Sequence, residues 1–441
     1  MKRDTIVAIG TPAGVGGIAV VRLSGADTLA IALEHLSVKT LQPRHATYCR
    51  FDNLDDIVAT WFPQGYSGEP TVEFSCHGSQ YVQQAMLQAL TASGARLADR
   101  GEFTMRAFLN GRLNLSQAEA VADLIEATTP AQHRLAVSQL RGGYAQTLST
   151  LRQQLMDLTS LLELELDFSQ EDLEFADRSQ LLSLIDTISV ETTALIDSFQ
   201  MGNAIKRGIP VAIVGAPNVG KSTLLNALLN DDRAIVSAIP GTTRDTIEET
   251  LNIGNVTFRL VDTAGLRHTD DEVERLGIER SRKAREQAMI IINVVDATQP
   301  FPTFGEEQPY DGKHIITVLN KADLIADFDP SKAAASECGT TVCISAKTGE
   351  GLDLLKQTML DAVGDGMPEG DTLLTNARHH EALLRVQQAL DNARRGLGDG
   401  LPADLVAVDL RDALYHLGAI TGEATSNDVL SNIFSRFCVG K

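Results

Sequence analysis

Cysteine is scarce in this 441-residue sequence, and the five cysteines stand far from any pairing motif. They are Cys49, Cys76, Cys338, Cys343 and Cys438. An odd number without a Cys-x-x-Cys pair predicts neither a disulfide framework nor a zinc site. This usage fits a reducing compartment, so we expect a cytoplasmic protein.

Long hydrophobic runs are also lacking. The longest, MIIINVV, stops at Asp296, well short of the roughly 18 apolar residues that a membrane-spanning helix requires. The N-terminal MKRDTIVAIGTPAG has two basic residues, but its apolar run is short and soon meets Pro12. The sequence therefore predicts neither a secretory signal nor a membrane association.

Positive charge is in deficit, because 38 basic residues face 58 acidic ones and the net charge is −20. Such a net negative charge disfavours binding to nucleic acid through the overall electrostatic field of the protein. If this protein acts on RNA, a local basic patch or a partner must supply the cationic surface.

The composition is that of a soluble globular chain, 43% hydrophobic and 22% charged, and the length predicts two or three domains. Short β-like runs such as GGIAVVRLSG predict a small α+β domain at 1–115. Helix-face spacing, as in LSQAEAVADLIEA, predicts a helical domain in two parts, 116–207 and 365–441. Between them, strands alternate with helices over 208–364, which predicts an inserted α/β domain with a parallel-rich sheet covered by helices.

A glycine-rich stretch opens the chemistry of that α/β domain. GAPNVGKS, Gly215 to Ser222, matches GxxxxGK[ST], follows an apolar run and precedes a helical pattern. Its backbone N–H groups can surround phosphates at the positive end of the following helix. Lys221 would reach the β and γ phosphates, and Ser222 would ligate Mg²⁺. The plainer interpretation of this stretch is a glycine-rich turn before a helix.

Four companion motifs follow in order, each at or near a strand end. DTAG would sense Mg²⁺ and the γ-phosphate, and a threonine of PGTTRD would complete the Mg²⁺ shell. In NKAD, Asp323 can accept hydrogen bonds from guanine N1–H and the 2-amino group, and SAK would support the base. Together the five motifs resemble the GTPase superfamily, which implies a Ras-like P-loop domain that binds GTP and GDP. The expected nucleotide contacts are Asn218, Val219, Gly220, Lys221, Ser222, Thr223, Ser237, Ala238, Ile239, Pro240, Gly241, Thr242, Thr243, Asp262, Thr263, Ala264, Gly265, Asn320, Lys321, Asp323, Ser345, Ala346 and Lys347.

Hydrolysis needs a group that orients water, and the position after DTAG holds Leu266, which cannot do so. The acidic stretch TDDEVERLG offers candidates, for which a solvated loop or helix N-terminus is the alternative interpretation. These candidates are Asp270, Asp271, Glu272 and Glu274. A monovalent cation held by Asn218 and carbonyls of VSAIPGTT could neutralise charge developing between the β and γ phosphates.

GxPNxGKS, PGTTRD, DTAGLR with DEVERLGIER, and the closing FCVGK together resemble the MnmE (TrmE) family of tRNA-modification GTPases. The resemblance covers the whole chain, including GEFTMRAFLNGRLNLSQAEAVADLI and ITGEATSNDVLSNIFSRFCVGK. It implies that Glu274 orients the water through a bridging water once two GTPase domains meet. It also implies a K⁺ site at Asn218, Ser237, Ile239 and Thr242, and a Mg²⁺ site at Ser222 and Thr243.

The resemblance also implies an N-terminal domain that dimerises and binds a reduced folate as one-carbon donor. The folate contacts would be Arg22, Glu73, Arg112 and Lys441. A buried carboxylate such as Glu73 can take two hydrogen bonds from the pterin 2-amino and ring N–H groups. Without the resemblance, both arginines would be surface cations and Glu73 an outward strand residue. Arg112 stands where the family often has Lys.

The final FCVGK raises three interpretations of Cys438. A prenylation box requires aliphatic residues after its cysteine, and Gly440 and Lys441 exclude it. A buried core cysteine beside Phe434 and Phe437 is the second interpretation. The resemblance implies the third, a catalytic role at the modification site.

The family also implies an FAD-dependent partner of the MnmG (GidA) family, with FAD on that partner. Together they would add an aminomethyl or carboxymethylaminomethyl group to C5 of the wobble uridine of certain tRNAs. A conformational-switch GTPase in ribosome assembly would share every nucleotide motif, but such proteins usually append an RNA-binding module. A membrane-remodelling GTPase lacks support, because no basic amphipathic helix or apolar anchor is evident.

Overall fold

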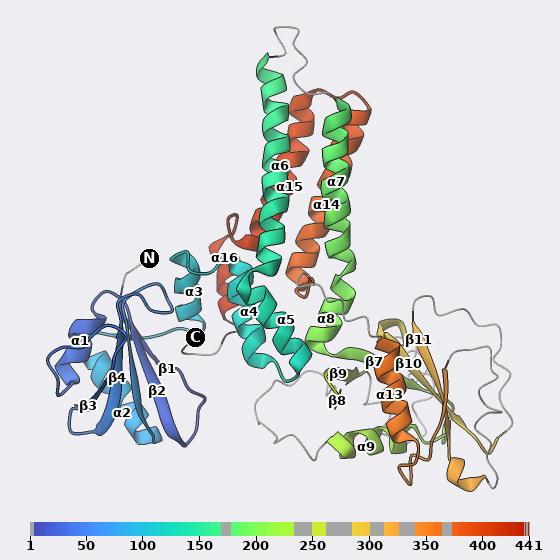
Figure 1. Ribbon diagram of the computed structural model, residues 1–441, viewed down its shortest axis with the longest axis horizontal. Coiled ribbons are helices and arrows are strands. Elements are labelled where there is room, and N and C mark those ends of the chain that lie inside the picture. The colour runs from blue at the N-terminus through green and yellow to red at the C-terminus, as the bar shows by residue number, and fades with distance from the viewer. Residues whose placement is uncertain are drawn as a thin grey trace. The chain divides into compact units, whose positions relative to one another are not determined.

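The structure is a computed structural model that describes residues 4–168, 178–232, 249–261, 285–299, 313–325, 340–363, 373–435, 437 and 440. The chain divides into two compact units. The first contains Met1–Glu126, Ala136–Ile196 and Arg378–Lys441, and the second contains Ala127–Leu135 and Asp197–Ala377. The second unit therefore interrupts the first in sequence (Figure 1).

A six-stranded sheet forms the N-terminal part of the first unit. Its order is β3 (Ala46–Phe51), β4 (Asp55–Phe62), β5 (Thr71–Gly78), β2 (Gly16–Ser24), β1 (Ile6–Ile9) and β6 (Arg96–Leu97), antiparallel except for β1 with β6. Helices α1 (Thr28–His35) and α2 (Gln80–Ala92) pack on it through Ile31, Met86 and Leu90.

Alternation along β2 and β5 gives the two faces of this sheet different chemistry. Val21 and Leu23 of β2, with Phe74 of β5, join the core beneath α1 and α2. Because side chains alternate along a strand, Arg22 and Glu73 face the other way, and they are direct cross-strand partners. On that face, Phe103 of α3 (Glu102–Leu109) packs with residues of β1.

Long helices form the rest of the first unit. They are α6 (Gly143–Phe168), α7 (Arg178–Asp197), α14 (Ala377–Gly398) and α15 (Ala403–Thr421), and they run side by side in Figure 1. Buried residues recur every three or four positions, as at 148, 151, 155, 158 and 162 of α6 and 406, 410, 413, 417 and 420 of α15. That spacing favours the near-parallel packing of helix bundles. The shorter helices of this unit are α4 (Leu115–Glu126) and α16 (Asn427–Phe434), whereas α5 (Pro130–Arg141) is divided between the two units after Leu135.

The second unit contains another six-stranded sheet, ordered β12 (Thr340–Cys343), β11 (His314–Asn320), β10 (Ile290–Asp296), β7 (Ile209–Val214), β9 (Val256–Leu260) and β8 (Glu249–Ile253). All neighbouring pairs are parallel except β8 with β9. Near-continuous apolar strands pack against α9 (Lys221–Asp232) and α13 (Leu352–Val363), as a sheet buried on both faces requires. Helix α8 (Phe199–Arg207) leads into β7.

The predicted fold class is confirmed: an α+β domain, a helical domain, and an inserted α/β domain with a parallel-rich sheet. The exact domain boundaries stay predictions. Among the described residues, no helix has the length and apolarity to cross a membrane. Within the same part of the chain, no group of three or more His, Cys, Asp or Glu residues could hold a metal ion.

Candidate functional site

The loop from Gly215 to Gly220 joins the end of β7 to the start of α9. Its backbone has positive φ at Gly215 (147°), Asn218 (63°) and Gly220 (99°). A Cβ on Gly215 would lie 2.2 Å from the Val294 carbonyl oxygen, so the loop runs directly over β10. A glycine-rich turn at the N-terminus of a twelve-residue helix presents backbone N–H groups and a positive dipole end, which suit an anion.

Lys221 begins α9 and folds back over this loop. Its Nζ donates to the carbonyl oxygens of Gly215 (2.9 Å) and Ala216 (2.8 Å). Burial lowers the pKa of Lys221 from its usual value. A phosphate between loop and ammonium would supply the negative charge that offsets this desolvation.

Asn320, at the end of β11, ties three segments together. It is 3% exposed, its Nδ2 donates to the Val219 carbonyl (2.8 Å), and its Oδ1 accepts from the Ala346 amide (2.9 Å). The phosphate loop and the Ser345–Lys347 loop are therefore held at one edge of the sheet by one side chain. Asp323 follows in the short helix η2 (Ala322–Leu324) and is exposed, so its carboxylate is accessible to a base.

Asp296, at the end of β10, belongs to this edge although motif reasoning did not assign it a role. Its Oδ2 lies 2.6 Å from Nζ of Lys321, and Thr298 donates its hydroxyl and amide to Oδ1. These hydrogen bonds, with that of Lys321 first, lower the pKa of Asp296 to about 2. The signal in the sequence was a carboxylate that ends a buried apolar strand, next to the strand that carries NKAD.

Several predicted nucleotide, catalytic and folate-binding residues lie outside the described residues. They are Ser237, Ala238, Ile239, Pro240, Gly241, Thr242, Thr243, Asp262, Thr263, Ala264, Gly265, Glu274, Cys438 and Lys441. The other predicted nucleotide residues include three groups that the structure brings together at one edge of the second sheet. These are the phosphate loop with Lys221, Asn320 with Lys321, and Ser345 with Ala346.

On the N-terminal domain, Arg22 and Glu73 form an ion pair. Arg22 donates from Nε and Nη2 to Glu73 Oε1, both at 2.8 Å, and from Nη1 to the carbonyl of Gly440 at 3.3 Å. Its guanidinium carbon also lies 5.7 Å from the Tyr66 ring centre and 5.6 Å from that of Phe103. Two aromatic rings and three polar contacts therefore fix the orientation of this cation.

The third predicted folate residue, Arg112, lies in the turn after α3 and is exposed. Its backbone amide donates to the Ala107 carbonyl (2.8 Å). Its side-chain stem lies beside Gly68, where an added Cβ would be 3.1 Å from Cγ of Arg112.

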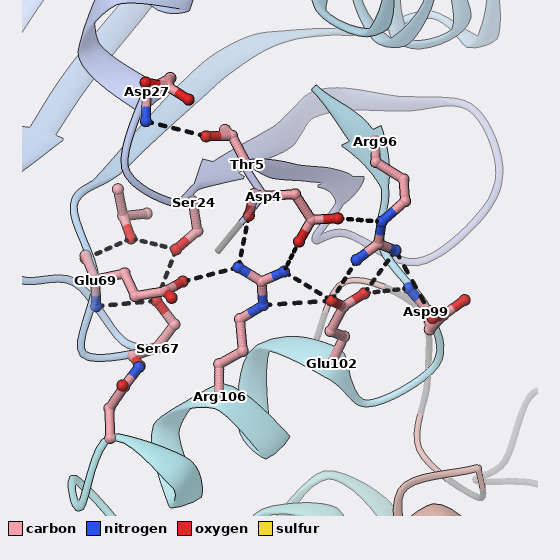
Figure 2. Close-up of polar contacts among 12 residues, drawn as sticks. Asp4, Thr5, Ser24, Asp27, Ser67, Glu69, Arg96, Asp99, Glu102 and Arg106 are labelled. Carbon is pink, nitrogen blue, oxygen red and sulfur yellow. Dashed lines mark hydrogen bonds and ion pairs between the residues drawn. The ribbon is translucent and has the colours of Figure 1, made fainter. Parts of the chain in front are cut away.

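Helix α3, which supplies Phe103, is fixed by the ion-pair network of Figure 2. Arg106 is 8% exposed and donates to Asp4, Glu69 and Glu102. Arg96 pairs with Asp4 (2.7 Å) and Glu102 (2.7 Å). The hydrogen bond from Arg96 comes first among the causes that lower the pKa of Asp4 to about 2. A buried arginine with satisfied donors makes α3 a rigid support.

A second buried cluster lies in the helical part of the first unit. Arg378 and His379 of α14 both contact Glu119 of α4, at 3.0 and 2.7 Å. Burial alone would raise the pKa of Glu119, but these two partners outweigh it and lower the pKa to about 2. Tyr144 of α6 stacks on His379, with ring centres 5.6 Å apart.

A third arrangement resembles a catalytic triad in its distances. His35 contacts Asp52 through Nδ1 (2.8 Å) and the Ser93 hydroxyl through Nε2 (2.9 Å). However, the amides of Ser93 and Gly94 donate to carbonyls of α2, so neither can stabilise an oxyanion. We interpret the three residues as a structural link between α1, α2 and the turn after β3.

A phosphate loop at a helix N-terminus, an Asn-Lys-x-Asp segment and a Ser-Ala-Lys loop at the same sheet edge define a P-loop guanine-nucleotide-binding protein. The family model described as the MnmE helical domain matches residues 115–438, and the model described as the GTP-binding protein TrmE N-terminus matches residues 5–112. The chain belongs to the MnmE family of tRNA modification GTPases, so the predicted resemblance is confirmed.

Relatives named tRNA modification GTPase MnmE match along almost their whole length. The protein from Porphyromonas gingivalis is 47% identical over 469 residues, covering 100% of this chain and 98% of that protein. The protein from Christiangramia forsetii is 44% identical over 470 residues, covering 99% of each. A solved variant of Era from Aquifex aeolicus bound to GDP and AlF4⁻ is 32% identical, covering 41% of this chain and 65% of that chain. The TM-score of that match is 0.27.

Proposed function

We propose that this GTPase modifies C5 of the wobble uridine in certain tRNAs, adding an aminomethyl or carboxymethylaminomethyl group with a reduced folate as one-carbon donor. The proposal includes a homodimer and a partner of the FAD-dependent MnmG family, which supplies FAD. The observation that carries the proposal is the hydrogen bond between Arg22 and Gly440. It joins residues 418 positions apart, and it supports a folate site at which Gly440 lies beside the Arg22–Glu73 pair.

The residues on this face have chemistry that suits a folate. Glu73 is 30% exposed, and Arg22 contacts only its Oε1. Oε2 lies outside that ion pair and can accept hydrogen bonds from a pterin. The folate would supply the carbon unit. Four residues would bind and orient it: Arg22, Glu73, Arg112 and Lys441. Cys438 is proposed as the catalytic thiol or acid at this site.

In the nucleotide site, Ser222 with Thr243 would hold Mg²⁺, and Asn218 with backbone groups of Ser237, Ile239 and Thr242 would hold K⁺. The left-handed backbone of Asn218 (φ 63°) is a conformation that asparagine tolerates better than most residues. These cations would supply charge stabilisation for phosphoryl transfer. Lys221 would bind the phosphates, and Glu274 would orient the attacking water.

The cation assignment predicts faster GTP hydrolysis in KCl than in NaCl at equal ionic strength, by several-fold, because Na⁺ is smaller. Asn218→Ala should remove that difference. Glu274→Ala should leave GTP binding unchanged and slow turnover by orders of magnitude. Equal rates in both salts for the wild type would refute the role of Asn218.

Mass spectrometry of nucleosides from bulk tRNA tests the whole proposal. Cells without this gene should lose C5-aminomethyl-type uridines, and the wild-type gene should restore them. If Cys438→Ser fails to restore them while the protein still hydrolyses GTP, Cys438 has a chemical role. An unchanged profile in the deletion strain would favour the ribosome-assembly switch, which shares every nucleotide motif.

A further inference from the structure

The end of β10 holds the start of the Asn-Lys-x-Asp turn. β10 and β11 are parallel neighbours whose last residues, Asp296 and Asn320, are paired across the sheet. The Ala297 amide donates to the Asn320 carbonyl (2.9 Å), and the Asp296 carboxylate lies 2.6 Å from the Lys321 ammonium. One strand end therefore fixes both the main chain and a side chain of the neighbouring turn.

Lys321 occupies a backbone conformation that residues with long side chains rarely adopt. Its φ of 69° and ψ of 33° lie in the left-handed region. Among the described residues other than glycine, four have positive φ, and two of these, Asn218 and Lys321, belong to the nucleotide edge. Strained backbone of this kind persists where the surrounding contacts over-determine it. The ion pair with Asp296 is such a contact, because it holds the end of the Lys321 side chain.

The Asp296 carboxylate is itself held in place. Asp296 is 5% exposed, and its Oδ1 accepts from both the amide (3.0 Å) and the hydroxyl (2.7 Å) of Thr298. Its other oxygen, Oδ2, accepts from Nζ of Lys321. A buried carboxylate with these donors can rotate only by losing hydrogen bonds that water does not readily replace. The position of the Lys321 ammonium is therefore fixed as well.

The ion pair gives the two lysines of this edge different tasks. Nζ of Lys221 lies over the phosphate loop, 2.9 Å from the Gly215 carbonyl, whereas Nζ of Lys321 is directed to Asp296. Lys221 is thus available to phosphates, while the partly exposed side chain of Lys321 offers a ligand its apolar stem. A flat base can pack on such a stem while Asp323, two residues along the chain, accepts hydrogen bonds from the edge of the base.

We infer that Asp296 is a positioning residue for guanine recognition, which holds Lys321 and the left-handed turn leading into Asp323 in the geometry that receives the base. Thr298 contributes by fixing the carboxylate. The inference rests on the proposed assignment of the base to Asp323, and it adds a residue that none of the five nucleotide motifs contains. Because the ion pair is on the base side of the site, its loss should change nucleotide affinity and leave the rate of the chemical step unchanged.

A double-mutant cycle on the full-length protein tests this role. Asp296→Asn removes the charge and keeps an oxygen for Thr298, Lys321→Met removes the ammonium and keeps the stem, and a third variant combines both changes. The control is Asp353→Asn, which removes an exposed carboxylate in the first turn of α13 of the same unit. Fluorescence titration with mant-GDP gives Kd, and steady-state hydrolysis of GTP gives KM and kcat.

We expect Asp296→Asn to raise the mant-GDP Kd about tenfold and the KM for GTP by a similar factor, with kcat within about twofold of the wild type. In the Lys321→Met background, the same change should alter Kd by less than about twofold, because that background lacks the ammonium through which Asp296 acts. Asp353→Asn should change neither constant. If Asp296→Asn does not fold, Thr298→Val deletes one donor at an exposed position and should still raise Kd by roughly threefold.

Three results would overturn the inference. They are an unchanged Kd in Asp296→Asn, a rise in Kd that persists in full in the Lys321→Met background, and a fall in kcat with KM unchanged. Where Asp296→Asn does not fold, an unchanged Kd in Thr298→Val has the same meaning.

The assignment of the base is tested separately by Asp323→Asn. If this variant bound mant-GDP as tightly as the wild type, the base would lie elsewhere and that assignment would fail. The double-mutant cycle would still decide whether Asp296 acts through Lys321.

Discussion

Replacing Glu119 by glutamine gives a measurable test of the buried cluster on α4 and α14. The side chain is 12% exposed and contacts Arg378 and His379. Its pKa falls from 4.5 to about 2 on folding, which corresponds to an upper bound of about 3 kcal/mol at neutral pH. A carboxylate with a lowered pKa stabilises the fold fully above pH 4.5, and this contribution is lost as the pH falls toward 2.

The effect of Glu119→Gln on the opening equilibrium of these helices should therefore depend on pH. At pH 7, Glu119→Gln should raise the opening equilibrium of α4 and α14 by up to about 300-fold, and at pH 3 by only about tenfold. Protection factors from hydrogen exchange of peptides in those helices measure this, after correction for the intrinsic exchange rate at each pH.

The matched control is Glu163→Gln, which removes an ion pair with Arg411 that is about half exposed on both sides, at 47% and 61%. An exposed pair contributes less than about 1 kcal/mol, so its effect should be several-fold at most. If Glu119→Gln had the same effect at both pH values, or none at pH 7, the electrostatic reasoning would be refuted.

Three further substitutions have definite expectations. Gly220→Ala would place a Cβ 2.2 Å from Asn320 Nδ2, so it should weaken mant-GDP binding roughly tenfold or more. The control Gly349→Ala has a similar φ of 87° and nothing within 4 Å of the added Cβ, so it should leave mant-GDP binding unchanged. Equal losses of affinity in both variants would show that the clash with Asn320 is not the cause. Asp323→Asn replaces an acceptor by a donor, so GTP affinity should fall roughly 100-fold and xanthosine triphosphate should bind better than GTP in competition. Tyr144→Phe removes a buried hydroxyl without a hydrogen-bond partner among the described residues. Urea unfolding should therefore show a free energy of unfolding that is unchanged or higher by up to about 1 kcal/mol. A loss above about 1 kcal/mol would show that the hydroxyl makes a stabilising hydrogen bond.

The nucleotide edge could be predicted because its information is local in sequence. Eight consecutive residues encode the phosphate loop, and strand ends in a parallel sheet meet at one edge whatever the details of packing. Asn320 therefore contacts the phosphate loop, and Lys321 forms an ion pair with Asp296, as the order of the strands requires.

The supports of the N-terminal site could not be predicted in this way. Arg106 and Asp4 are 102 positions apart, and Arg378 and Glu119 are 259 apart. Arginine and glutamate are rarely buried, so sequence alone places them at the surface. Only the tertiary fold shows that their charges are paired, and the same holds for the hydrogen bond from Arg22 to the Gly440 carbonyl.

The nested order of the chain has a consequence for biosynthesis. Helices α6 and α7 emerge from the ribosome before the 181 residues of Asp197–Ala377, and their bundle partners α14 and α15 come after. Synthesis proceeds at about 5–20 residues per second. The apolar stripes of α6 and α7 are therefore made on the order of ten seconds or more before those partner helices. We therefore expect a nascent chain of this protein to expose the apolar surfaces of these two helices during synthesis. The hydrogen bond from Arg22 to the Gly440 carbonyl can form only after another 418 residues have been added to the chain.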